Sequence, residues 1–379
     1  MANNRLMILG TNEYQNPLIL RAKELGYETH VFGWPHGEIG EKTADVYHPV
    51  NILDYELLWQ ECRKLNPCGV ASVCSELAMH PMNFLLRRLG IPCNSEATEN
   101  MTTNKYLMRK AMKEGGIDSP NFTLVKKGQP LDEIIKATAD FSYPLIIKPC
   151  DLSSSRGVFK IDKPANLSQG VEYAMGWSKT GEAILEEFIE GQEYSGESIA
   201  YNGEYHLLAV TEKFTTGAPH FVETGHRQPA RLSEEWMNKI RATLFKAFKS
   251  LDIQYGAIHP EFRITPDGRI LFMEIATRMG GDCIGTDLVP LSSGYDFLGM
   301  VINICCGKAP VFDKIRTPMI ARNNYIITAS DLEKFNEIKA INPEKIWRHS
   351  DIKPLTDSPV LKSADRAGYY ITIEPLNQQ

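Results

Sequence analysis

Short apolar runs alternate with amphipathic segments along the first 95 residues of the chain. The apolar runs predict β-strands at 6–9, 28–32 and 69–73. The amphipathic segments predict helices at 17–25, after Asp54, and at 81–89. Strands that alternate with helices in this way favour a parallel sheet covered by helices.

The alternation continues beyond a polar stretch at 94–104. It predicts strands at 122–126, 144–148, 158–161, 183–187, 194–201 and 205–214, and helices at 105–114, 131–139 and 167–177. An amphipathic helix capped by Ser233 follows, with one apolar face made of Trp236, Ile240, Leu244, Phe248 and Leu251. An apolar helix within 295–305 and shorter strands at 319–327 and 369–373 complete the pattern. We therefore expect an α/β protein with a small β-rich C-terminal region.

Composition places the chain among globular proteins, because 43% of its 379 residues are hydrophobic and 23% are charged. A chain of this length can bury a large core and should divide into domains. The net charge of −6 and the lack of long basic runs disfavour nucleic acid as a partner. The first loop, 10–17, lacks the G-x-G-x-x-G pattern, so the sequence does not favour a dinucleotide-dependent dehydrogenase.

Neither a signal peptide nor a membrane span is expected, because no apolar run approaches about 18 residues. None of the eight cysteines forms a Cys-x-x-Cys pair, and most lie among apolar residues. We expect reduced, buried thiols rather than a disulfide framework or a zinc site. These features together predict a cytoplasmic protein.

The most informative chemistry lies in a predicted hairpin at 257–278. Asp267-Gly268 stands between two apolar runs and predicts a type I′ turn, in which both central residues need a positive φ. With the turn centred there, Glu261 lies directly opposite Glu274. Directly opposite side chains have Cβ atoms about 4.5–5.5 Å apart, and like charges at that separation are destabilising. A cation between the carboxylates would remove the repulsion, and hard oxygen ligands suit Mg²⁺.

The alternation sorts the hairpin residues onto two faces. One face would carry Phe262, Ile264, Leu271, Met273 and Ile275. The other would carry His259, Glu261, Arg263, Glu274 and Ala276. The alternative interpretation is an edge hairpin whose two glutamates simply point into water.

Two further segments suggest a nucleotide site. Lys148 ends an apolar strand, where a lysine is unusual unless it meets an anion. The Ser/Gly loop at 151–158 follows, and its N–H groups and hydroxyls could bind phosphate, although a plain hairpin turn would look similar. The strand at 183–187 runs into an acidic turn whose backbone could read an adenine edge. Glu193 could then accept hydrogen bonds from ribose hydroxyls, while a solvated strand end is the alternative.

The order of these motifs resembles that of the ATP-grasp superfamily of carboxylate–amine and thiol ligases. The resemblance covers roughly residues 100–310. It rests on Asn104-Lys105, Ile147-Lys148-Pro149, the loop 153–157, Leu185–Ile189 with Glu193, and Glu261 and Glu274 followed by Arg278 and Gly280-Gly281. The segments 221–226 and 274–281 most resemble the L-amino-acid ligase branch.

The resemblance implies an ATP-grasp fold preceded by a Rossmann-like parallel-sheet domain, with a small β-rich C-terminal region. The expected boundaries are 1–98 for the N-terminal domain, 99–310 for the ATP-grasp domain and 311–379 for the C-terminal region. A lid at about 120–192 would belong to the ATP-grasp domain.

The resemblance also implies the residues that bind ATP. These are Lys105, Lys148, Ser153, Ser154, Ser155, Gly157, Val158, Glu186, Glu187, Phe188, Ile189 and Glu193. Lys105 and Lys148 would hold the phosphates, and the Ser153–Val158 segment would be the phosphate loop. Glu186, Glu187 and Ile189 would line the adenine site, and Glu193 would bind the ribose.

Metal and catalytic residues follow from the same resemblance. Glu261 and Glu274 would bind Mg²⁺. Many members carry an asparagine two residues after the second glutamate as a further ligand; here that residue is Ala276, which leaves the number of Mg²⁺ ions open. Catalysis would involve Lys148, Arg278 and His226. Arg278 would act on the transferred phosphoryl group or a substrate carboxylate, and His226 would sit in the substrate pocket.

The implied reaction is phosphoryl transfer followed by acyl transfer. A carboxylate attacks the γ-phosphate of ATP, and an amine then displaces phosphate from the acyl phosphate to form an amide. The expected partners are a small carboxylate and an amine, one of them an amino acid, and a homodimer is a reasonable default. Two alternatives remain open: a carboxylase-type or carbamoyl-phosphate-type ATP-grasp enzyme that needs a partner chain, and a non-catalytic nucleotide-binding module.

Overall fold

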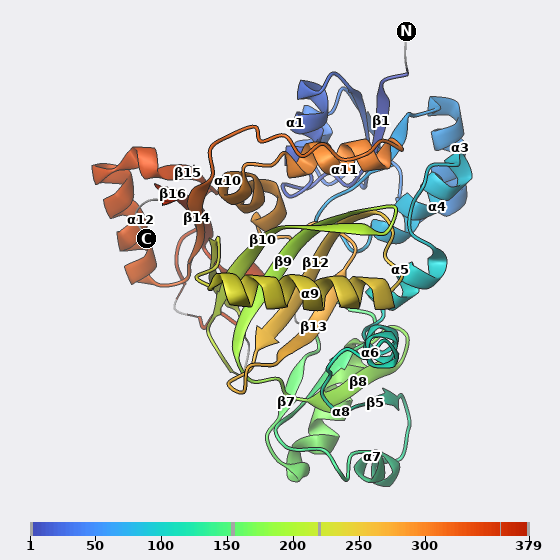
Figure 1. Ribbon diagram of the computed structural model, residues 1–379, viewed down its shortest axis with the longest axis vertical. Coiled ribbons are helices and arrows are strands. Elements are labelled where there is room, and N and C mark those ends of the chain that lie inside the picture. The colour runs from blue at the N-terminus through green and yellow to red at the C-terminus, as the bar shows by residue number, and fades with distance from the viewer. Residues whose placement is uncertain (1–2, 153–155, 219–220, 357, 377–379) are drawn as a thin grey trace.

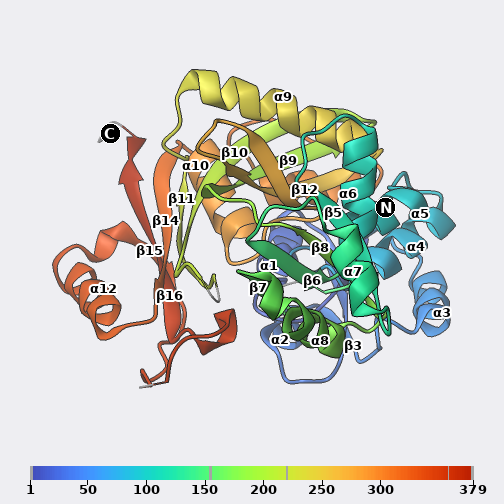
Figure 2. The same cartoon turned by 90° about the horizontal axis from the view of Figure 1, so that it is seen from below.

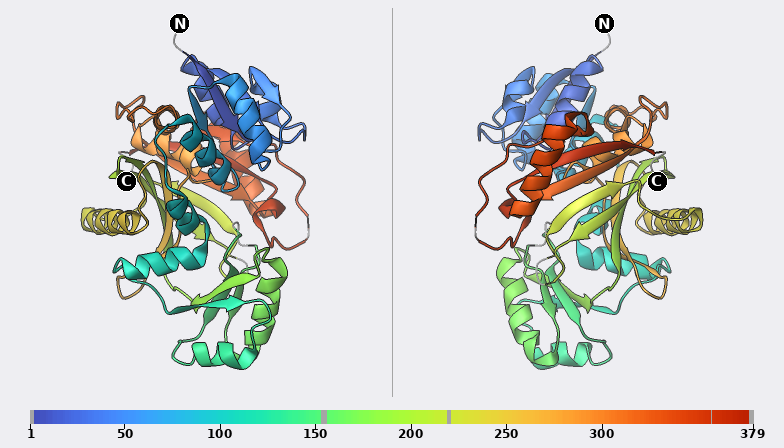
Figure 3. Two further views of the ribbon diagram at one scale, coloured as in Figure 1. Left: turned by 90° about the vertical axis from the view of Figure 1, so that its right-hand side faces the viewer. Right: turned by 90° about the vertical axis from the view of Figure 1, so that its left-hand side faces the viewer.

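The computed structural model describes residues 3–152, 156–218, 221–356 and 358–376. Within these ranges the backbone forms an N-terminal sheet (β1–β4), a lid sheet (β5–β8) and a central sheet (β9–β16). The N-terminal sheet and the lid sheet lie at opposite ends of the molecule, with the central sheet between them (Figure 1, Figure 3). No helix in this part of the chain is long and apolar enough to cross a membrane.

The N-terminal sheet has the strand order β3-β2-β1-β4, and its strands are parallel, as the alternation predicts. They are β1 (Arg5–Leu9), β2 (Glu28–Phe32), β3 (Val46–His48) and β4 (Gly69–Ala71). The helices of this region are α1 (Asn16–Glu24), α2 (Ile39–Thr43), α3 (Tyr55–Leu65) and α4 (Met79–Leu89). Asp54 caps α3 by accepting a hydrogen bond from the Leu57 N–H, and Gly90 ends α4 with a φ of 72°.

The lid sheet is antiparallel, with the strand order β5-β8-β6-β7. Its elements are β5 (Phe122–Lys126), α7 (Leu131–Ala137), β6 (Leu145–Pro149), β7 (Phe159–Ile161), α8 (Leu167–Trp177) and β8 (Glu182–Glu187). Leu145 and Ile147 belong to a separate small core of the lid. Because side chains alternate along a strand, Lys148 points to the opposite face of β6.

The central sheet has the order β13-β12-β9-β10-β11-β14-β16-β15, so the C-terminal strands extend it instead of forming a sheet of their own. Its strands are β9 (Gln192–Tyr201), β10 (Glu204–Thr215), β11 (Glu223–Gln228), β12 (Gly256–Ile264), β13 (Ile270–Ala276), β14 (Met319–Ile326), β15 (Ile346–His349) and β16 (Gly368–Pro375). Helix α9 (Glu234–Ser250) covers one face (Figure 2) and buries Ile240, Leu244 and Phe248 there. Helix α12 (Ala329–Ile341) lies beside the C-terminal strands.

The remaining helices join these parts. The polar stretch at 94–104 contains α5 (Glu96–Thr103), capped by Ser95, and α6 (Lys105–Glu114) follows directly. A π-helical turn (Ile284–Leu288) leads into α10 (Val289–Ser293) and α11 (Phe297–Cys305). Phe297 and Met300 of α11 share one hydrophobic core with β1, so this helix packs against the N-terminal sheet.

Candidate functional site

The two glutamates of the predicted hairpin lie directly opposite each other on β12 and β13, as the sequence predicts. The turn that joins the strands is not type I′, because Gly268 has a φ of 80° while Asp267 is not left-handed. The Thr265 N–H donates to the Arg269 carbonyl at 3.0 Å, which leaves a three-residue loop. A β-bulge after Glu261 then compensates for the shifted turn and restores the Glu261–Glu274 pairing.

The same bulge overturns part of the predicted face assignment. Phe262 pairs with Phe272, and it is Ile270 and Phe272 that join it in the core beneath α9. The prediction had placed Leu271 and Met273 on that face, because it extended an unbroken register back from the turn.

Each glutamate holds a lysine ammonium group. Lys105 Nζ lies 2.9 Å from Glu274 Oε2, and Lys213 Nζ lies 2.5 Å from Glu261 Oε1. Burial alone would raise the pKa of Glu274, but the Lys105 ammonium outweighs it and the pKa falls below its usual value. Burial acts in the same way on Glu261, where Lys213 and then His259 bring the pKa well below its usual range.

The carboxylate pair fits Mg²⁺, which proteins usually bind through one or two carboxylates together with substrate phosphates. The charge of Glu261 opposes the ionisation of Glu274, and a divalent cation would relieve that repulsion. Across the described ranges, no group of three or more His, Cys, Asp or Glu side chains could hold a metal ion. The rest of the coordination shell would therefore have to come from a nucleotide and water. Ala276, buried opposite His259, offers no ligand.

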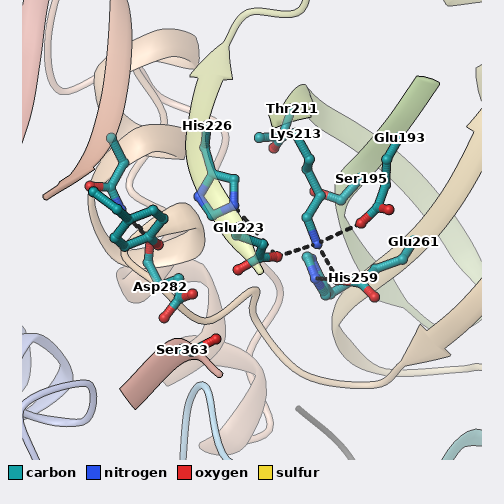
Figure 4. Close-up of polar contacts among 12 residues, drawn as sticks. Glu193, Ser195, Thr211, Lys213, Glu223, His226, His259, Glu261, Asp282 and Ser363 are labelled. Carbon is teal, nitrogen blue, oxygen red and sulfur yellow. Dashed lines mark hydrogen bonds and ion pairs between the residues drawn. The ribbon is translucent and has the colours of Figure 1, made fainter. Parts of the chain in front are cut away.

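Lys213, on β10, lies among three carboxylates, those of Glu193, Glu223 and Glu261, which are called the acidic cluster below. The sequence analysis did not single out this lysine. Besides Glu261, its ammonium contacts Glu223 at 2.7 Å and Glu193 at 3.4 Å (Figure 4). Burial lowers the pKa of Lys213, but the three carboxylates raise it well above its ordinary value. Lys213 follows Thr211 and Glu212, beyond the apolar run 207–210 of β10, so the signal that singled out Lys148, a lysine at the end of an apolar run, was absent here.

Glu193 lies at the start of β9, where the chain passes from the lid sheet to the central sheet; this junction is called the hinge below. Arg263 donates to the Glu193 carboxylate at 3.0 Å and to the Ile189 carbonyl at 2.6 Å. The Arg263 guanidinium also lies over the ring of Phe188, 5.1 Å from its centroid. Glu187 accepts a hydrogen bond from the Ser142 N–H at the base of the lid. Ile189, predicted for the adenine site, and Glu193, predicted for the ribose, are therefore held by one side chain, that of Arg263.

A groove runs along this hinge and is lined in part by Glu187, Phe188, Ile189 and Leu271. Lys148, Glu261 and Glu274 are not among its lining residues. The groove and the cluster of charged residues are thus separate surfaces of the hinge region.

Lys148 and Glu186 form a buried pair, with Lys148 Nζ 2.6 Å from Glu186 Oε1. The other oxygen of Glu186 binds Arg109 of α6. Burial lowers the pKa of Lys148 and outweighs the opposing effect of Glu186. Glu186 is only 1% exposed, so its side chain faces two cations rather than an open nucleobase pocket.

Only part of the predicted phosphate loop can be placed, because Ser153, Ser154 and Ser155 lie outside the described residues. Gly157 has a φ of 74°, and a Cβ atom there would lie 2.7 Å from the Pro149 side chain. Val158 leads into β7. Lys105 Nζ donates to the Leu152 carbonyl at 2.8 Å, which links the first lysine to the start of the loop.

His226 and Arg278 border the acidic cluster. His226 is 1% exposed, and its Nε2 lies 3.6 Å from Glu223 Oε1, too far for a hydrogen bond. Within the described part of the chain, the two ring nitrogens of His226 have no hydrogen-bond partner, and the Nε atom of Arg278 has none either. Buried polar atoms of this kind are suited to hydrogen bonds with a substrate or with water. The charge of Arg278 lowers the pKa of Glu274, so Arg278 lies near the glutamate pair.

Comparison with known proteins gives one domain match and several relatives. Residues 141–287 match the family model of the ATP-grasp domain. The chain is 29% identical over 300 residues to alanine–anticapsin ligase of Bacillus subtilis, which covers 69% of this chain and 61% of that protein. It is 22% identical over 305 residues to an uncharacterized protein of Sinorhizobium fredii, covering 77% of this chain and again 61% of the relative. The chain therefore spans about three fifths of the length of these curated relatives.

Solved structures show the fold. The L-amino acid ligase of Bacillus licheniformis has a TM-score of 0.80 at 22% identity, covering 98% of this chain and 93% of that one. Phosphoribosylglycinamide synthetase of Anaerococcus prevotii has a TM-score of 0.77 at 22% identity, covering 99% and 95%. These likenesses confirm the predicted ATP-grasp fold with a preceding parallel-sheet domain. The match of residues 141–287 to the ATP-grasp domain and the likeness of the whole fold to these solved structures therefore agree with each other.

Proposed function

We propose that the protein is an ATP-dependent ligase that joins a carboxylate to an amine through an acyl phosphate and releases ADP and phosphate. The observation that carries the proposal is the convergence of Lys105 and Lys148 with the opposed pair Glu261 and Glu274 where the lid meets the central sheet. The similarity to alanine–anticapsin ligase and to L-amino acid ligase supports the same reaction class.

In this proposal the hinge and the two lysines bind ATP. The backbone of 187–189 reads the adenine edge, and Glu193 accepts hydrogen bonds from the ribose. Lys105 and Lys148 bind the phosphates, and in the free protein their charges are balanced by Glu274 and Glu186. Mg²⁺, held by Glu261 and Glu274, would neutralise charge on the phosphates.

Catalysis then depends mainly on position and charge. Arg278 stabilises the phosphoryl group in transit, because a guanidinium can hold two of its oxygens at once. Closure of the lid keeps water from the acyl phosphate, which would otherwise hydrolyse. The amine displaces phosphate from the acyl carbon once both substrates are held in contact.

The residues around His226 favour an amino acid as one substrate. Glu223 and Asp282 lie beside His226, and burial together with the charge of Glu223 raises the pKa of Asp282. Arg366 contacts both carboxylates, at 3.4 Å and 2.9 Å. The two carboxylates could bind an α-ammonium group, while Arg366 could bind an α-carboxylate.

A screen of ADP release tests the proposal. The purified protein is incubated with Mg-ATP and with single amino acids, small carboxylates and pairs of them, and the new amide is identified by mass spectrometry. We expect ADP and an amide only with a carboxylate–amine pair, and far less of both with Lys148→Ala. Tight ATP binding without turnover would instead support a nucleotide-binding module. ADP release that needs bicarbonate would support the carboxylase-type alternative.

A further inference from the structure

One of the largest fully buried side chains in the described ranges is charged: Arg109 of α6. Its Nε and Nη2 atoms donate to Glu186 Oε2 at 3.0 Å and 2.8 Å. Its Nη1 atom donates to the Phe272 carbonyl at 2.7 Å. The guanidinium therefore connects α6 with lid strand β8 and with strand β13 of the central sheet.

Stability alone is a poor reason for a buried arginine at this position. Taking a guanidinium and a carboxylate out of water costs so much that apolar residues of similar volume are often equally or more stabilising. The neighbours of Arg109 are suited to an apolar side chain, since Met108, Met112 and Phe272 belong to the core beneath α9. The fixed, fork-shaped set of donors on arginine instead gives its partners a defined geometry.

One of those partners holds the lysine assigned to the ATP phosphates. Glu186 uses Oε2 for Arg109 and Oε1 for Lys148, whose Nζ lies 2.6 Å away. Arg109 and Lys148 carry two positive charges against the single negative charge of Glu186. The three side chains therefore have a net charge of +1, which can attract an anion such as a phosphate group.

The other partner links Arg109 to the metal glutamates. Phe272 lies two residues before Glu274 on β13. Lys105, which binds Glu274, stands four residues before Arg109, so both side chains project from the same face of α6. One face of one helix thus holds Lys105 directly and Lys148 through Arg109 and Glu186.

We propose that Arg109 is a positioning residue that, through Glu186, sets where the Lys148 ammonium lies relative to Lys105 and Glu274. This inference rests on the proposed function, because it takes Lys148 to bind the phosphates of ATP. Because Arg109 binds both Glu186 of β8 and the Phe272 carbonyl of β13, it holds the end of β8 against the strand that carries Glu274. Arg109 itself, buried behind Glu186, does not touch the nucleotide.

A double-mutant cycle tests this coupling. The affinity for a non-hydrolysable ATP analogue, in the presence of Mg²⁺, is measured by calorimetry. The native protein, Arg109→Met, Lys148→Met and the double variant are compared. We expect Arg109→Met to weaken binding about tenfold in the native background, and about twofold or less once Lys148 is already methionine. Equal losses in both backgrounds would overturn the proposal, because Arg109 would then act independently of Lys148.

The matched control is Arg21→Met. Arg21 also donates from Nε and Nη2 to a single carboxylate oxygen, that of Asp296, at 3.0 Å and 2.7 Å. We expect this variant to bind the analogue like the native protein, whatever its thermal stability. If Arg109→Met does not fold, Arg109→Lys replaces it in the cycle, since a lysine keeps the charge but cannot hold both partners.

The same experiment also tests the proposed function, through the affinity of the Lys148→Met variant for the analogue. If Lys148→Met alone binds the analogue as tightly as the native protein, Lys148 is not a phosphate ligand and both proposals fail. If Lys148→Met weakens binding and the cycle is additive, the nucleotide site stands and only the role of Arg109 is withdrawn.

Discussion

Glu186 shares its two carboxylate oxygens between Lys148 and Arg109, so each cation can be removed without leaving the carboxylate unpaired. This matters because an unpaired charge in the interior is strongly destabilising. Variants of Lys148 should therefore report on function more than on folding. The same sharing explains how a buried lysine can remain available for an anion.

Lys148→Ala should cut turnover by roughly 10²–10³-fold, the usual scale for removing one electrostatic stabiliser. Folding should be largely unaffected, because Arg109 continues to pair with Glu186. Steady-state ADP release and thermal unfolding measure the two effects separately. Lys126→Ala is the matched control, since Lys126 also lies on a strand of the lid sheet, β5, and its ammonium pairs with Glu182 at 4.0 Å. Near-native activity of Lys148→Ala would show that the lysine is structural.

Glu274→Gln should raise the Mg²⁺ concentration needed for nucleotide binding. The amide keeps the shape of the side chain but removes the charge that attracts a hard cation and balances Lys105. A Mg²⁺ titration of ATP-analogue binding measures the effect. The control is Glu182→Gln on β8, whose carboxylate lies 4.0 Å from Lys126. An unchanged Mg²⁺ dependence would argue against Glu274 as a ligand.

Local patterns were enough to predict much of this fold. The alternation of apolar runs and amphipathic segments gave the parallel N-terminal sheet, and the apolar face of α9 followed from its spacing. The pairing of Glu261 with Glu274 was also predicted, although a wrong turn type and an unforeseen bulge compensated for each other. The bulge appears only in the pairing of β12 with β13, where Phe262 lies opposite Phe272, and no short segment encodes that pairing.

The centre of the site could not be predicted in the same way. The partners of Lys213 come from β9, β11 and β12, so its role exists only once those strands lie side by side. Arg109 reaches a glutamate 77 residues away for the same reason. Helix α5 was missed because its sequence is polar, although Ser95 stood as a capping signal.

Cys68 should react with iodoacetamide at a lower pH than an ordinary cysteine. Its Sγ lies 3.8 Å from Cys306 Sγ, and that contact, followed by the charge of Lys308, brings the Cys68 pKa to about 7 despite partial burial. The thiolate is the reactive form, so the labelling rate should rise with pH and reach half its maximum near pH 7 rather than near about 8.5. Labelling rates by mass spectrometry measure this, and the buried Cys62, whose pKa burial raises to about 12, is the internal control. The Cys306→Ala variant, which has no hydrogen-bond donor at this position, should move the midpoint upward, and an unmoved midpoint would assign the effect to another group.

Arg278→Lys should not be a conservative change. A planar guanidinium can hold two phosphate oxygens at once, whereas an ammonium group acts as a point charge. Arg278 lies just beyond the end of β13, and its charge acts on Glu274, so it is near the site where the phosphoryl group would be transferred. We therefore expect kcat to fall while the KM for ATP changes little, the pattern of an interaction made mainly in the transition state.

Steady-state kinetics with each substrate varied in turn distinguish this role from substrate binding. If only the KM of the carboxylate or amino-acid substrate rises, Arg278 binds a substrate carboxylate and the catalytic role is withdrawn. Arg322→Lys is the control, because Arg322 also pairs with a carboxylate, that of Glu374 at 3.1 Å, on strands β14 and β16. Its kinetics should remain native, since that pair is separate from the glutamates that bind Lys105 and Lys213. A parallel fall in kcat for both variants would mean that arginine-to-lysine changes disturb the central sheet as a whole rather than the phosphoryl site.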